Sequence, residues 1–283
     1  MKLRTKDVGH FHETPLVVFT CLAILGGGLA AGRIPLWILG LVAWTPRRME
    51  GGFVALSVGA GMLASLLHLG RRGRMLQALR RRGRSALSTE VAFAGLTAAA
   101  AFAFLILPVT SSYVSLASLL WSITAVSGLG LLFAVAWVYM LPGQLSWGIS
   151  AVPSPVVLGL VFGILAYVKP GALTTIAVTA LLAAEGLLYA LRWPLLEHRR
   201  NWGAPAHARF FKARRALVLA RLVVASVLPI TAVLLEAYAA ALAMLGIGIA
   251  IDRFAFYALA LRQTTEAEVT RIETLIRADR ITG

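Results

Sequence analysis

Long apolar stretches separated by short polar segments dominate the sequence. A transmembrane helix needs about 20 predominantly apolar residues to cross the hydrocarbon core of a bilayer, and eight stretches reach or approach that length. The fifth is short and the last two meet at Glu236, so seven crossings is the competing count. The stretches cover residues 15–44, 53–70, 89–107, 113–141, 154–168, 172–193, 216–235 and 237–261. The pattern predicts an all-α integral membrane protein, a bundle of eight transmembrane helices.

Composition strengthens the membrane assignment. The 283 residues are 59% hydrophobic and 14% charged, whereas soluble domains have roughly 45–50% apolar and about 25% charged residues. The net charge of +15 alone would suit nucleic-acid binding. However, the basic residues interrupt apolar runs too long for a soluble DNA-binding module, so we expect no nucleic-acid partner. The single cysteine, Cys21, excludes an internal disulfide or a cysteine-ligated cluster within the chain.

The chain divides into one large unit and a short tail. We expect residues 1–263 to form the transmembrane domain, with no internal repeat. The first apolar run is too long for a signal-peptide core, so we expect it to be retained. Residues 264–283 mix charges with apolar residues at helical spacing, which predicts a short amphipathic helix on the membrane surface or against a partner.

Basic residues are distributed unevenly between the two sides of the predicted bundle. With eight crossings, 21 Lys and Arg fall on the side of both termini, and only Arg47, Arg48 and Lys169 fall on the other. By the positive-inside rule the basic side is cytoplasmic. We therefore expect a bacterial cytoplasmic (inner) membrane protein with both termini inside. A docking face for an acidic partner or for anionic lipid headgroups would give the same asymmetry.

Several polar side chains lie inside or at the ends of the apolar stretches. A charged residue at a helix centre costs roughly 2.5–3.5 kcal/mol on insertion scales, which makes such residues functional candidates. Arg33 lies toward the non-basic side, where we expect an interfacial anchor. Asp252 and Arg253 are adjacent, which suits an ion pair and a ligand site equally. The candidates on the basic side, from six spans, are Glu13, His68, Glu90, Tyr139, Arg221 and Tyr257, and the further charged candidates within the spans are Glu185, Asp252 and Arg253.

The grouping of Glu13, His68 and Glu90 predicts proton chemistry at one membrane face. Together they supply acids, bases and hydrogen-bond donors, which a lipid-soluble quinol needs on losing two electrons and two protons. Only His68 among five histidines belongs to a predicted span, so we expect no haem in this chain. The sequence also lacks a Walker loop, an HExxH pair and a GxSxG elbow, and we expect no metal site. The electron partner must then belong to another subunit.

Three motifs carry a family resemblance. The chain opens with HETPLVVFT at residues 12–20, continues with LHLG at 67–70, and then has SALSTE at 85–90. Weaker matches follow at Val138-Tyr139 with Trp147 downstream, at Arg221, and at residues 252–257. In these features the sequence resembles the membrane anchor subunits of dimethyl sulfoxide reductase-type molybdoenzymes, over nearly its whole length.

The resemblance implies a haem-free, eight-helix anchor with a quinone pocket. It assigns quinol binding and oxidation to His68 and Glu90. The further quinone-binding candidates are Glu13, Tyr139, Trp147, Arg221, Arg253 and Tyr257. The implied partners are an iron–sulfur subunit carrying several clusters and a catalytic subunit carrying molybdenum bis-pterin.

The direction of electron flow stays open at this point. Arg71-Arg72 stands where many relatives have Ser-Pro, and related anchors serve either quinol-oxidising reductases or quinone-reducing complexes of the sulfite dehydrogenase type. The quinone itself is menaquinone or ubiquinone. Two other functions remain: a transporter or ion-conducting bundle, and a docking scaffold without quinone chemistry.

Overall fold

The computed structural model describes residues 14–68, 86–108, 113–137, 153–168, 171–198 and 215–258, and their regular structure is helical. The segment 215–234 is one continuous helical segment in which a π-helical turn, η5, joins two α-helices. The elements are α1 (Thr14–Ile38), α2 (Arg48–His68), α4 (Ala86–Ile106), α5 (Val114–Trp137), α6 (Pro153–Tyr167), α7 (Ala172–His198), α9 (Arg215–Leu222), η5 (Val223–Val227), α10 (Leu228–Leu234) and α11 (Tyr238–Ala258).

The described helices confirm a multi-pass membrane protein. Seven of them, counting 215–234 as one, are long and apolar enough to cross a bilayer. The remaining apolar helix, α6, has 15 residues, less than the roughly 20 that a crossing requires. The predicted helix near residue 154 is therefore present, while its status as an eighth crossing stays a prediction.

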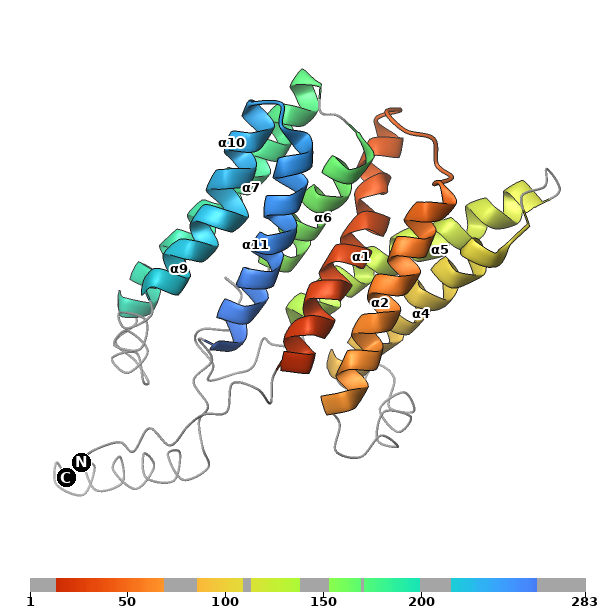
Figure 1. The fold of residues 1–283 in the computed structure, drawn as a ribbon, viewed down its shortest axis with the longest axis horizontal. Coiled ribbons are helices and arrows are strands. Elements are labelled where there is room, and N and C mark those ends of the chain that lie inside the picture. Colours follow the sequence, from red (N-terminus) through yellow and green to blue (C-terminus); the bar gives the residue numbers. More distant parts are fainter. Residues whose placement is uncertain are drawn as a thin grey trace, which may run out of the picture.

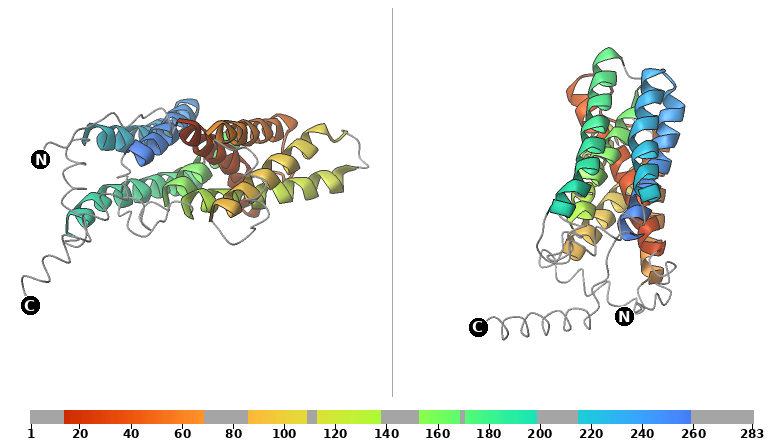
Figure 2. Two further views of the ribbon diagram at one scale, coloured as in Figure 1. Left: turned by 90° about the horizontal axis from the view of Figure 1, so that it is seen from below. Right: turned by 90° about the vertical axis from the view of Figure 1, so that its left-hand side faces the viewer.

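Successive helices alternate in direction along the bundle (Figure 1). α1, α4, α6 and α9 begin at the end drawn at the bottom of Figure 1, and α2, α5, α7 and α11 finish there. We call this the lower end and the opposite one the upper end. The arrangement brings the first turn of α4 and the last turns of α11 to the same end of the molecule, as the right-hand view in Figure 2 also shows.

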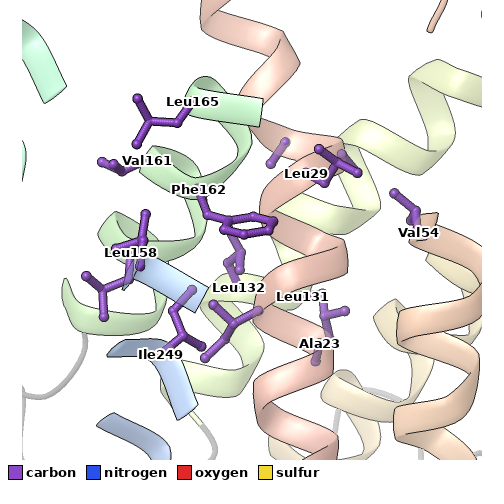
Figure 3. Close-up of a cluster of buried hydrophobic side chains, with 14 of the residues drawn as sticks. Ala23, Leu29, Val54, Leu131, Leu132, Leu158, Val161, Phe162, Leu165 and Ile249 are labelled. Carbon is purple, nitrogen blue, oxygen red and sulfur yellow. The ribbon is translucent and has the colours of Figure 1, made fainter. Parts of the chain in front are cut away.

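α1 is the central helix and packs against α2, α5, α6 and α11. It approaches α6 closely through glycines: a Cβ added to Gly28 would lie 2.2 Å from the carbonyl oxygen of Gly159. Small residues permit such close backbone contact between helices in lipid. Around this contact, side chains from α1, α5, α6 and α11 fill the core shown in Figure 3, including Phe162, Leu132 and Ile249.

Two turns at the upper end set helix boundaries. α1 ends at Ile38, short of the predicted Trp44, because Gly40 adopts a φ of +70° and the amide of Leu41 bonds back to the carbonyl of Leu36. Glu236 has a φ of 57° and separates α10 from α11, with the amide of Ala237 bonded to the carbonyl of Ala232. Both are left-handed helix caps. The junction predicted at Glu236 is confirmed, and the predicted end of the first span at Trp44 is wrong.

Candidate functional site

A group of buried charged side chains lies in the lower half of the bundle. It comprises Glu185 on α7, Arg221 on α9, and Asp252 and Arg253 on α11, all nearly inaccessible to solvent. We call these four residues the ionic array. Buried charges are tolerated when they are paired and hydrogen-bonded. The two arginines and two carboxylates give the array no net formal charge.

Arg221 is the best-connected member of the array. Its Nη1 donates to Oε2 of Glu185 at 2.8 Å, its Nη2 donates to Oε1 of the same carboxylate, and its Nε donates to Oδ1 of Asp252 at 2.8 Å. Nη2 also donates to Oγ of Ser154 at 3.0 Å, and the guanidinium lies over the ring of Tyr189 at 3.9 Å from its centroid. The planar, delocalised guanidinium suits this combination of bidentate pairing and stacking.

Asp252 joins the two arginines. Its Oδ1 accepts from Arg221, and its Oδ2 accepts from Nε of Arg253 at 2.9 Å and from Nη2 of the same guanidinium. Arg253 in turn lies over the ring of Phe256, 4.8 Å from its centroid. Of the two roles predicted for Asp252 and Arg253, the structure forms the ion pair and extends it to a third residue.

The π-helical turn gives Glu185 a further hydrogen bond. η5 occupies residues 223–227 and follows α9 without a break. Ser226 lies within this turn and is buried. Its hydroxyl donates to Oε2 of Glu185 at 3.3 Å. Such turns occur frequently at functional sites.

Glu90 lies in the first turns of α4 and is 1% exposed. Its Oε1 has no hydrogen-bond partner within the part of the chain that the structure describes. Glu90 is therefore a buried acid at the same end of the bundle as an array whose charges are already balanced.

Four of the predicted site residues are brought into the lower part of the bundle. Glu90, Arg221, Arg253 and Tyr257 are all buried, and Tyr257 packs with Phe256, Leu16 and Val17. The backbone of His68 ends α2 at the same end. The side chain of His68, and Glu13, Tyr139 and Trp147 entirely, lie outside the described residues, as do the arginine-rich segments and the predicted tail at 264–283.

The sequence did not reveal every contributor. Ser154 and Ser226 hydrogen-bond the array, but single serines in apolar helices carry no distinguishing pattern.

Arg33 was expected to anchor at an interface, and this expectation is wrong. It is 6% exposed because Glu50 and the loop carbonyls of Ala43 and Thr45 hold it inside the upper end.

Within the described ranges no group of three or more His, Cys, Asp or Glu could hold a metal ion.

In the part of the chain that the structure describes, an all-helical, multi-pass bundle with paired buried charges and a buried carboxyl whose Oε1 lacks a hydrogen-bond partner defines an integral membrane protein with polar groups buried between its helices. The DMSO reductase anchor subunit (DmsC) family model matches residues 8–185. The chain belongs to this family and is the membrane anchor of a molybdoenzyme complex. Comparisons with curated proteins and with solved structures gave no match. The matched segment ends at Glu185, so Arg221, Asp252 and Arg253 lie beyond it.

Proposed function

We propose that this chain is the quinone-reactive anchor of its complex, passing electrons between the membrane quinone pool and an iron–sulfur subunit. The observation that carries the proposal is Glu90: a carboxyl 1% exposed, with Oε1 unpartnered in the described structure. Buried polar atoms are normally hydrogen-bonded, and exceptions call for a functional explanation. A quinol hydroxyl would supply the missing donor, and a quinone oxygen would accept from a protonated Glu90.

Bound quinone supplies two-electron, two-proton chemistry, and the protons need acceptors in the protein. Glu90 suits this role because no cation in the ionic array is left over to bind its carboxylate permanently. His68, at the end of α2, is the second group assigned to proton transfer, since an imidazole exchanges protons near neutral pH. A carboxyl that accepts a proton during quinol oxidation returns it during quinone reduction, so the same residues serve either direction.

The cation of Arg253 complements these two groups. It lies in the last turns of α11, at the same end of the bundle as Glu90, and is a candidate to bind a quinone oxygen. Tyr257, one turn further along α11 and also buried, is a further candidate. Glu13, Tyr139, Trp147 and Arg221 remain further quinone-binding candidates.

The remaining electron carriers belong to other subunits. The family implies association with a catalytic subunit and an iron–sulfur subunit, and we assign molybdenum bis-pterin to the first and the clusters to the second. We place the anchor in the bacterial cytoplasmic membrane with both termini on the cytoplasmic side, because the eight-crossing arrangement expected from the sequence assigns 21 basic residues to that side.

The test is quinol turnover by the purified complex carrying Glu90→Gln or His68→Leu. Loss of a general acid or base typically costs 10²–10⁴-fold, so each variant should lower turnover by about 10²-fold or more. Glu236→Gln is the matched control, because Glu236 is exposed in a turn at the upper end, and it should turn over normally. The soluble subunits should co-purify with every variant. Full turnover by both site variants would make the chain a docking scaffold without quinone chemistry.

A further inference from the structure

Glu90 lies on the inward face of α4, within a group of four helices. α1, α2, α4 and α5 alternate in direction (Figure 1), and α4 packs mainly against α2 and α5. The buried face of α4 begins with Glu90 and continues at helical spacing through Ala94 and Thr97, both fully buried. Ligand sites in helix bundles are built from such inward-facing side chains. A lipid-soluble quinone reaches a group in this position by passing between helices.

Two contacts fix how α4 and α5 face each other near Glu90. The hydroxyl of Thr97 donates to Oγ of Ser127 at 2.9 Å, between the two helices. Four residues earlier on α4, the ring of Phe93 lies against Gly130 of α5. Residues three apart on a helix are neighbours on its surface. Glu90 therefore lies one turn below the contact between Phe93 and Gly130.

Three residues of α4 lead stepwise from the interior of the bundle to its surface. Three residues fall short of a helical turn by about 60°, so Phe93 is rotated by that angle from Glu90, and Leu96 by the same angle again. Glu90 is 1% exposed, Phe93 is half-buried and Leu96 is 49% exposed. On α5, Phe133 follows Gly130 by three residues and is 52% exposed. Lipid tails are as apolar as these exposed side chains, so Phe93 lies between the lipid and the buried acid.

The absence of a side chain at Gly130 sets the position of the Phe93 ring. A Cβ added to Gly130 would lie 2.7 Å from Cδ1 and from Cζ of that ring, which would have to move. The other glycine of α4 that faces a neighbour differs. A Cβ added to Gly95 would meet the Cε of Met62 at the ordinary contact distance of 3.9 Å. Gly130 is thus the position at which one added methyl group displaces the aromatic ring next to Glu90.

We propose that Phe93 is the aromatic wall of the quinone site and that Gly130 is a positioning residue, which lets the Phe93 ring lie against α5. This inference rests on the proposed function. Aromatic rings pair by offset stacking or edge-to-face contact. A quinone bonded to the carboxyl of Glu90 lies one helical turn from the Phe93 ring, within reach of such contact. The quinone reaches this position from the lipid, along the interface of α4 and α5.

The experiment measures binding of two probes, menadione and a short-chain ubiquinone, to the whole complex in lipid nanodiscs by isothermal titration. An aromatic contact corresponds to roughly two- to tenfold in an equilibrium constant. Phe93→Leu keeps an apolar side chain and removes the ring, so the tighter-binding probe should bind about fivefold more weakly. Phe93→Tyr keeps the ring and should recover most of the binding.

The role of Gly130 is tested by a double-mutant cycle. Gly130→Ala displaces the ring and should weaken binding by a factor similar to that of Phe93→Leu. The double replacement should bind no more weakly than Phe93→Leu alone, because a residue that acts through the ring has no effect once the ring is gone. Additive losses would overturn the positioning role. Gly95→Ala is the matched control on α4 and should bind the probe as the unaltered complex does.

The outcomes separate this inference from the proposed function. Unchanged binding by Phe93→Leu, with Glu90→Gln weakened, would overturn the aromatic wall and leave the proposed function standing. No binding of either probe by the unaltered complex would overturn both. If Phe93→Leu does not assemble, photolabelling of the unaltered complex with an azido derivative of menadione replaces it. Labels on α4 and α5 around Phe93 and Gly130 are expected, and labels confined to other helices would overturn the proposal.

Discussion

Two buried arginines, one at each end of the bundle, have similar burial and different surroundings. Arg33 at the upper end donates to the carbonyls of Ala43 at 2.8 Å and Thr45 at 3.0 Å and to the Glu50 carboxylate at 2.9 Å. These partners lie 10 to 17 residues away in sequence. Arg221 is instead held by side chains from three other helices, up to 67 residues away.

The difference is the basis for proposing a structural role for the upper cluster and a site near the lower one. The Arg33 contacts close the turn between α1 and α2, and Glu50 also caps the amide of Arg47. Each of those charges has its partner. The ionic array is equally well paired, but Glu90 at the same end has an Oε1 without a partner in the described structure. Burial of charge is thus common to both ends, and this buried acid is the reason for proposing the site at the lower end.

The largest effect should come from breaking the array at its centre. Arg221→Met leaves the carboxylates of Glu185 and Asp252 buried without their main partner. Removing one member of a buried pair typically costs about 3–5 kcal/mol, and the free energy of unfolding of the purified anchor should fall by that amount. The double replacement Arg221→Met with Glu185→Leu should recover most of the loss. A double variant no more stable than the single one would contradict the pairing.

Breaking the upper cluster should cost less and leave the chemistry intact. Arg33→Met removes three contacts, but its charged partner, Glu50, has a side chain 24% exposed, which water can solvate. We expect the free energy of unfolding to fall by about 2 kcal/mol, measured in the same assay. Quinol turnover per assembled complex should stay unchanged. A turnover defect would mean that the upper end also serves the quinone reaction.

A smaller effect is expected at the π-helical turn. Ser226→Ala removes one hydrogen bond at the long distance of 3.3 Å, which should lower the free energy of unfolding by about 0.5–1 kcal/mol. Thermal unfolding of the purified complex would detect this as a small shift of Tm. A loss as large as that of Arg221→Met would show that the serine contributes more to the array than its geometry indicates.

The smallest effect on stability is expected at Glu90, the proposed proton acceptor. Glu90→Gln keeps the shape of the side chain, and Oε1 has no hydrogen bond to lose within the described structure. We expect the free energy of unfolding to change by less than about 1 kcal/mol, in the same assay that detects the Arg221 variant. Large destabilisation would instead indicate a structural role for this carboxyl.

Much of the molecule follows from its sequence pattern. Apolar runs predicted the helices, and the motif at residues 85–90 predicted the family, which residues 8–185 confirm. The pairing of Arg221 with Glu185 was not predictable, because contacts between helices depend on packing that no periodicity encodes. For the same reason Arg33 was misassigned. Its partner Glu50 precedes the predicted start of the second span and joins it only because α2 begins at Arg48.

The most direct test of the site assignment is to locate the bound quinone. An azido-quinone can be photo-crosslinked to the complex in membranes and its attachment mapped by mass spectrometry of peptides. Assignment of the pocket to the lower end predicts labelled peptides from the first turns of α4 around Glu90 and from the end of α11 around Arg253, competed away by unmodified quinone. Labels confined to the upper end around Arg33, or none that quinone competes for, would contradict it.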